Sequence, residues 1–211
     1  MIDNSRQIME LIGSGDEGFC MVQVMHRGKD GRMPFETGDS PVAMQVIKTY
    51  YVSNAEYLER KMPEIRELCR VFNARAYINL NRKTWKQVAL KSLELLAGYV
   101  AHEEWTCVKS MVESACGKTG DWSGDKKWIV DIDTKDMREV EAVKGIVDSC
   151  EPAGDKVVAL VPTVHGYHLV TRPFNKDRFR KEYGKAIDIH DNNPTLLYYI
   201  GVEEEWSDLG C

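Results

Sequence analysis

The sequence has no long apolar segment, no close pair of cysteines and no excess of basic residues. Because no run of about 18 apolar residues occurs, we expect no transmembrane helix and no membrane partner. The first residues, Met-Ile-Asp-Asn-Ser-Arg, lack the basic-then-apolar order of a secretion signal, which favours a cytoplasmic protein. The formal net charge of −5 argues against a uniformly basic surface that coats nucleic acid, but it is compatible with a local basic groove.

The six cysteines are too dispersed for a structural zinc site, which needs close pairs to complete a tetrahedron. Disulfides are not expected in a cytosolic chain of this size. We therefore interpret the thiols as small hydrophobic groups of the core. They are Cys20, Cys69, Cys107, Cys116, Cys150 and Cys211.

Strand-like and helix-like segments alternate along the chain, without an internal repeat or a long linker. The predicted helices cover residues 4–13, 55–73, 84–115 with a break near 98–103, 136–150 and 175–183. The predicted strands cover residues 19–26, 43–52, 74–80, 128–130, 156–161, 167–171, 186–189 and 196–200. This order predicts one α+β domain over residues 1–211, with a mixed or antiparallel sheet and flanking helices.

A short apolar strand over residues 128–130 leads into Asp131 and Asp133. Residues two apart in a strand project from the same face, so both carboxylates would stand side by side. Such a pair ionises readily only with a cation between its members, and oxygen ligands suit Mg²⁺. The alternative is structural: Asp133 and Thr134 would begin the following helix as its cap.

Two later segments carry further candidate residues. His168 follows the glycine turn at Gly166 and lies early in a predicted strand, where an imidazole can contact a phosphate or a metal, or serve as a partly buried structural histidine. Asp188 stands between Ile187 and Ile189, and a carboxylate in such a strand needs compensation unless this strand face is solvated.

Taken together, these segments resemble the motifs of the archaeo-eukaryotic primase superfamily, particularly its primase-polymerase branch. The matching residues are Ile129-Val130-Asp131-Ile132-Asp133, then Gly166-Tyr167-His168, then Ile187-Asp188-Ile189 ahead of Leu196-Leu197-Tyr198. The resemblance covers residues 128–200, whereas residues 1–127 carry no family signature and would form the N-terminal part of the same domain. Gly166 stands where the family commonly has a serine or a similar small residue.

The resemblance implies an RRM-like catalytic core and a DNA primase or polymerase activity. Asp131, Asp133 and Asp188 would be catalytic and hold two divalent ions, Mg²⁺ or Mn²⁺, and His168 would contact the triphosphate of a nucleoside triphosphate. Arg172 and Lys176 open a basic stretch that would bind substrate, either the triphosphate or the backbone of a DNA or RNA template. The rest of this stretch is Arg178, Arg180, Lys181 and Lys185. A chain of this length would work with a partner such as a replicative helicase or another replication protein.

Two other functions remain open from the sequence. The same aspartates would serve a different metal-dependent phosphotransferase or phosphatase. A primase-like fold would also serve as a non-catalytic, nucleic-acid-binding replication accessory. Among the basic residues of the N-terminal part, we expect Arg82 and Lys83 to be surface charges.

Overall fold

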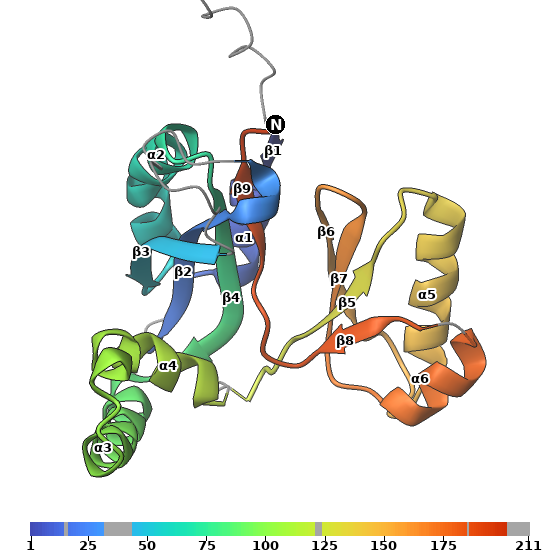
Figure 1. Ribbon diagram of the computed structural model, residues 1–211. Coiled ribbons are helices and arrows are strands. Elements are labelled where there is room, and N and C mark those ends of the chain that lie inside the picture. The colour runs from blue at the N-terminus through green and yellow to red at the C-terminus, as the bar shows by residue number, and fades with distance from the viewer. Residues whose placement is uncertain (15–16, 32–43, 121–123, 185, 202–211) are drawn as a thin grey trace, which may run out of the picture.

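Two antiparallel sheets, each with its own helices, form two lobes in the computed structural model (Figure 1). The structure describes residues 1–14, 17–31, 44–120, 124–184 and 186–201. The first lobe comprises the described residues up to 120 together with 195–201, and the second lobe comprises 124–190. The α+β class and the antiparallel sheet predicted from the sequence are confirmed.

The first lobe is built on a five-stranded sheet with the order β1-β9-β4-β2-β3. Its strands are β1 (Ile2–Asp3), β2 (Phe19–Arg27), β3 (Met44–Val52), β4 (Arg75–Lys83) and β9 (Thr195–Tyr199). Its helices are α1 (Ser5–Ile12), α2 (Ala55–Val71), α3 (Trp85–Ala101) and α4 (Met111–Lys118), with short 3-10 turns η1 (Gly28–Asp30) and η2 (Trp105–Ser110). Side chains alternate along β2, so Cys20 and Val22 pack toward α1 and α2, whereas Phe19 packs toward α3 and α4.

Side-chain caps begin the long helices of the first lobe where the sequence predicts them. The Asn54 side chain accepts a hydrogen bond from the Tyr57 amide at the start of α2. The Thr84 side chain does the same for Gln87 at the start of α3. Each cap satisfies an amide that has no partner within the helix, so a polar residue just before an apolar-periodic run fixes where the helix starts.

The second lobe contains β5 (Trp128–Ile132), α5 (Met137–Ser149), β6 (Val157–Pro162), β7 (Tyr167–Thr171), α6 (Lys176–Tyr183) and β8 (Asp188–His190). Its four strands lie in the order β6-β7-β5-β8, and every neighbouring pair is antiparallel. One face of this sheet is covered by α5 and α6 (Figure 1), and Val130 and Leu169 pack there with Val143 and Phe179. Residues at alternate positions, such as Asp131 and His168, therefore belong to the opposite face.

The opposite face of the second sheet meets the first lobe at β6 and β7. Val161 and Val170 belong to the core that α1 and α2 form with the first sheet. The Asn4 side chain donates to the carbonyl of Pro162 at 2.9 Å, and the Gln7 side chain donates to that of Leu160 at 3.0 Å. The two lobes are thus joined along one side of the second sheet.

The chain crosses between the lobes twice, and side chains of β4 form hydrogen bonds with both crossing segments. Asn81 donates to the carbonyls of Lys127 at 2.9 Å and Asp191 at 3.2 Å, and accepts from the Lys127 amide at 2.7 Å. Lys83 donates to the Thr119 carbonyl at 2.5 Å and to the Asn192 side chain at 3.0 Å. The expectation that Lys83 is a surface charge is therefore wrong, since its ammonium is buried beneath the crossing segments.

Most predicted elements are present, with changes at their ends. β4 runs on to Lys83, β8 begins at Asp188, and β9 begins at Thr195. The side chain that caps α5 is Asp136, which accepts from the Arg138 amide, so Asp133 is not the cap. The short strand β1 was not predicted, because two residues carry no periodic pattern.

The cysteine prediction is confirmed for Cys20, Cys69, Cys116 and Cys150, which are buried in the core, whereas Cys107 is only partly buried and Cys211 lies outside the described residues. Burial raises the pKa of the Cys69 thiol to about 12, consistent with an inert core group. None of the described helices is both long and apolar enough to cross a membrane.

Candidate functional site

One row of residues crosses the second sheet and brings together three predicted site residues. Asp131 of β5 lies directly opposite His168 of β7 on one side and Asp188 of β8 on the other. Directly opposite residues of antiparallel strands project from the same face of a sheet. Side chains from three separate parts of the sequence therefore share one surface.

Asp131 and His168 form the closest pair in this row. The distance from His168 Nε2 to Asp131 Oδ1 is 3.5 Å. The hydrogen bond from His168 lowers the pKa of the Asp131 carboxyl below its usual value, partial burial opposes this, and the charges of His168 and His190 lower it further. Asp131 is therefore an anion at neutral pH.

Thr195 fixes the ring of His168 from the other lobe. The distance from His168 Nδ1 to Thr195 Oγ1 is 2.9 Å, and Thr195 is buried at the start of β9. Since a carboxylate only accepts hydrogen bonds, Nε2 is the nitrogen that donates toward Asp131; the tautomer with its proton there leaves Nδ1 to accept from the threonine hydroxyl. Sequence reasoning missed Thr195; the available signal was a hydroxyl residue that begins an otherwise apolar strand.

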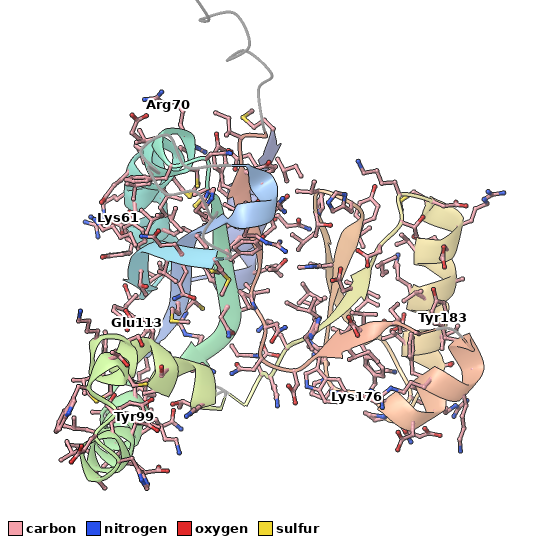
Figure 2. All side chains as sticks on the ribbon, viewed as in Figure 1. Lys61, Arg70, Tyr99, Glu113, Lys176 and Tyr183 are labelled. Atoms are coloured by element: carbon pink, nitrogen blue, oxygen red, sulfur yellow. The ribbon has the colours of Figure 1, made fainter. Side chains whose placement is uncertain are left out.

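A cavity of about 270 Å³ opens at the end of β5. Its wall includes the hydrogen bond that the Tyr183 hydroxyl donates to Glu139 at 2.7 Å, and Figure 2 shows Tyr183 on α6 beside α5. Burial, followed by this carboxylate, raises the pKa of Tyr183 to about 12. The lining residues are Asp131, Ile132, Asp133, Thr134, Glu139, Tyr183, Ala186, Ile187 and Asp188. All three predicted metal-binding aspartates thus line one cavity.

Gly166 presses the turn before β7 against the end of β5. A Cβ atom at Gly166 would lie 1.9 Å from the Ile132 carbonyl oxygen and 2.7 Å from the Thr134 nitrogen. The turn itself is closed by a hydrogen bond from the Thr163 amide to the Gly166 carbonyl at 2.9 Å. Only glycine permits this approach, which sets both the exit of β5 around Asp133 and the position of His168.

Arg172 and Lys176 lie at the opposite end of the row's central strand. Lys176 Nζ stands 4.2 Å from the centre of the Trp128 ring, and Arg172 donates to the Asp155 carbonyl at 3.4 Å. Trp128 is three residues before Asp131, a distance of about 10 Å along a strand. These two cations are therefore not in contact with the carboxylates.

The two arginines of α6 carry acidic partners. Arg178 pairs with Glu151 at 2.6 Å, and Arg180 pairs with Asp177 at 3.7 Å. Lys185 lies outside the described residues.

The side chains in the row suit a hard divalent ion that is shared with a ligand. Like charges directly opposite each other on a sheet are unfavourable, and the pair Asp131–Asp188 is of this kind. Mg²⁺ is commonly held by one or two carboxylates with phosphates and waters completing its shell. No group of three or more His, Cys, Asp or Glu side chains in the described part of the chain could hold an ion by itself. A divalent ion at this row would therefore need phosphates or waters to complete its shell.

Comparison of the chain with protein-family models, with curated proteins and with solved structures finds no match. Function is therefore inferred from the site itself and from the motifs that its residues carry.

Proposed function

We propose that the protein is a metal-dependent nucleotidyltransferase of the primase-polymerase type, which acts on nucleoside triphosphates with a nucleic-acid template. The observation that carries this proposal is the position of Asp188 directly opposite Asp131, with His168 on the other side. The three sequence motifs that resemble the primase superfamily are distant from one another along the chain. Their meeting in one row is what a shared catalytic site requires.

The element order of the second lobe also supports the proposal. The sequence of elements is β-α-β-β-α-β, with β5 and β7 as the central strands and β8 and β6 as the edges. This is the split β-α-β arrangement of ferredoxin-like and RRM-like folds. An RRM-like core is what the resemblance predicts for the catalytic part of a primase.

Each residue in the row has a chemical role under this proposal. Asp131 and Asp188 would hold a divalent ion, with Asp133 available from the rim of the same cavity. Such an ion would supply Lewis-acid activation of a hydroxyl and neutralise charge on the pyrophosphate. His168 would bind a phosphate oxygen, and Thr195 would keep its ring in the required orientation.

Arg172 and Lys176 would serve the template rather than the incoming nucleotide. Lys176 lies over the Trp128 ring, on the face of the sheet that α5 and α6 cover, whereas Asp131 belongs to the opposite face. A template strand would therefore have to pass around the Trp128 end of β5, about 10 Å from Asp131, to meet this cation.

Labelled-nucleotide incorporation on a primed template, with Mg²⁺ or Mn²⁺, tests the proposal. Asp131→Asn and Asp188→Asn keep the side-chain shape and remove the charge, so we expect each to lower incorporation by at least about 100-fold. Asp155→Asn, at an exposed position outside the row, should retain wild-type incorporation.

Two other outcomes would replace the proposal. Release of phosphate from small phosphoesters without polymerisation, and dependent on Asp131, would indicate a different phosphotransferase. Nucleic-acid binding that is indifferent to both substitutions, without incorporation, would indicate a non-catalytic accessory.

A further inference from the structure

The outer face of α3 is apolar and exposed, which is unusual for a helix at the surface of a lobe. Figure 1 shows α3 at the edge of the first lobe, away from the second lobe. Half or more of the side chains of Leu90, Leu93 and Val100 is exposed. A polar face is expected on a helix that meets only water, so this face is suited to another protein surface.

The exposed apolar residues follow the spacing of a helix-pairing seam. Leu90, Leu93, Ala97 and Val100 are separated by three, four and three residues, and all four are exposed. Alternating steps of three and four place side chains along one narrow stripe, which is the a and d pattern of paired helices. The occupant that fits this stripe is another helix.

A groove beside the stripe provides a second, independent indication that another molecule binds at this face. The groove lies between α3 and α4 and has a volume of about 360 Å³. The Ser92 hydroxyl, more than nine-tenths buried in its wall, has no hydrogen-bond partner among the described residues. A buried hydroxyl of this kind is costly unless something pairs with it. The lining residues are Trp85, Val88, Ala89, Ser92, Leu93, Leu96, Met111 and Val112.

Charges at the two ends of α3 favour a second copy of the same helix, running antiparallel. Lys86 lies at the first turn, and Glu103 and Glu104 follow the last turn, all of them exposed. When Leu90 faces Val100 of a second copy, the first turn of one α3, with Lys86, lies beside the end of the other, which Glu103 and Glu104 follow. The two ends of the pairing are therefore complementary in charge.

The area available is close to the lower limit for a specific interface. Trp85 and Trp105 are 55% and 59% exposed, and a fully exposed aromatic side chain presents about 200 Å². Together with the three exposed aliphatic side chains, each copy would bury on the order of 500 Å², or about 1,000 Å² for the pair. Trp85 also packs against Phe19 at 4.4 Å and Tyr51 at 5.0 Å between ring centroids, which anchors it before any pairing.

We propose that the protein forms a two-fold symmetric dimer through antiparallel pairing of α3 with α3 of a second copy. The pairing is independent of the aspartate row, which lies in the other lobe. In an isologous interface every residue acts twice, so a single substitution has a doubled effect.

Sedimentation of the full chain over a range of concentrations tests this dimer. Leu93→Glu should raise the dimer dissociation constant roughly 100-fold, because a charge enters the seam twice. Met44→Glu is the matched control, since Met44 is 63% exposed and Leu93 is 64% exposed, and it should leave the dimer unchanged. Circular dichroism of both variants checks whether each is folded.

Charge exchange tests the antiparallel direction. Lys86→Glu and Glu104→Lys should each weaken the dimer by about 10-fold, and the double variant should restore it. A wild-type chain that stays monomeric at about 100 μM overturns the proposal and leaves the face to a different helical partner. A dimer that survives Leu93→Glu, or one that the double variant does not restore, overturns it equally.

Discussion

Replacement of Gly166 by alanine tests whether the site depends on the close approach of two backbone segments. The added Cβ would lie 1.9 Å from the Ile132 carbonyl oxygen, and both contacting groups are backbone. Unstrained carbon contacts lie near 3.5 Å or beyond, so the turn or the end of β5 must move by more than about 1 Å. Overpacking of this kind costs about 3 kcal/mol when the neighbour cannot rotate away.

Thermal unfolding followed by circular dichroism measures this cost. For a chain of 211 residues, about 3 kcal/mol corresponds to a fall in Tm of roughly 6–12 °C. Gly145→Ala is the control, because Gly145 lies in α5 and nothing stands within 4 Å of the added atom. That variant should be about 1 kcal/mol more stable than the wild type, since alanine favours a helix.

The same variant connects packing with activity. Ile132 and Thr134 flank Asp133, so displacement of this segment moves a carboxylate of the proposed site. Gly166→Ala should therefore lose nucleotide incorporation at temperatures where it remains folded. An unfolding temperature within about 1 °C of the wild type would refute the reasoning, because a displacement of this size cannot be free of cost.

Four further predictions concern the row and the crossings. His168→Leu removes the leading cause of the low pKa of Asp131, the hydrogen bond from the imidazole, so an NMR titration of that carboxyl should give a higher value; an unchanged value would contradict the ion pair. Because the folded pKa of Asp131 lies below its usual 3.8, the stabilisation is complete above that value and is lost as pH falls through the folded pKa. Urea unfolding at a series of acidic pH values should therefore show a steeper loss for the wild type than for Asp131→Asn. Asn81→Ala removes the hydrogen bonds to both crossings and should cost about 2 kcal/mol, with faster hydrogen exchange of the Lys127 amide; slow exchange would contradict this. Lys83→Met removes the ammonium that donates to the Thr119 carbonyl and to Asn192 Oδ1, and should lower the unfolding free energy by about 2–3 kcal/mol, whereas a surface lysine would show no effect.

The sequence predicted elements well wherever periodicity and local capping agree. β7 spans Tyr167–Thr171 as expected, and Asn54 and Thr84 begin their helices. These features depend on neighbours within a few residues, which a single sequence contains. The meeting of Asp131, His168 and Asp188 followed from the order of short motifs rather than from any local rule, and the strand register places them in one row.

The features that the sequence did not reveal depend on partners far along the chain. Lysine usually lies at the surface, yet the Lys83 ammonium donates to Thr119 and Asn192, which are far from it along the chain. Thr195 falls just before the strand predicted over 196–200, and its role comes from His168 in the other lobe. The distance of Arg172 from the carboxylates is likewise set by the geometry of the sheet. Its closeness to His168 in the sequence does not predict this distance.

The place of β9 between β1 and β4 has a consequence for how the protein is made. The second lobe is a continuous stretch of chain, whereas the first sheet lacks an interior strand until β9 has been added. On a ribosome, a nascent chain that has emerged only as far as β8 would contain all strands of the second lobe, whereas the sheet of the first lobe would still lack β9. The first lobe, although synthesised first, would then complete its fold after the second lobe, because its sheet needs β9, which is synthesised last.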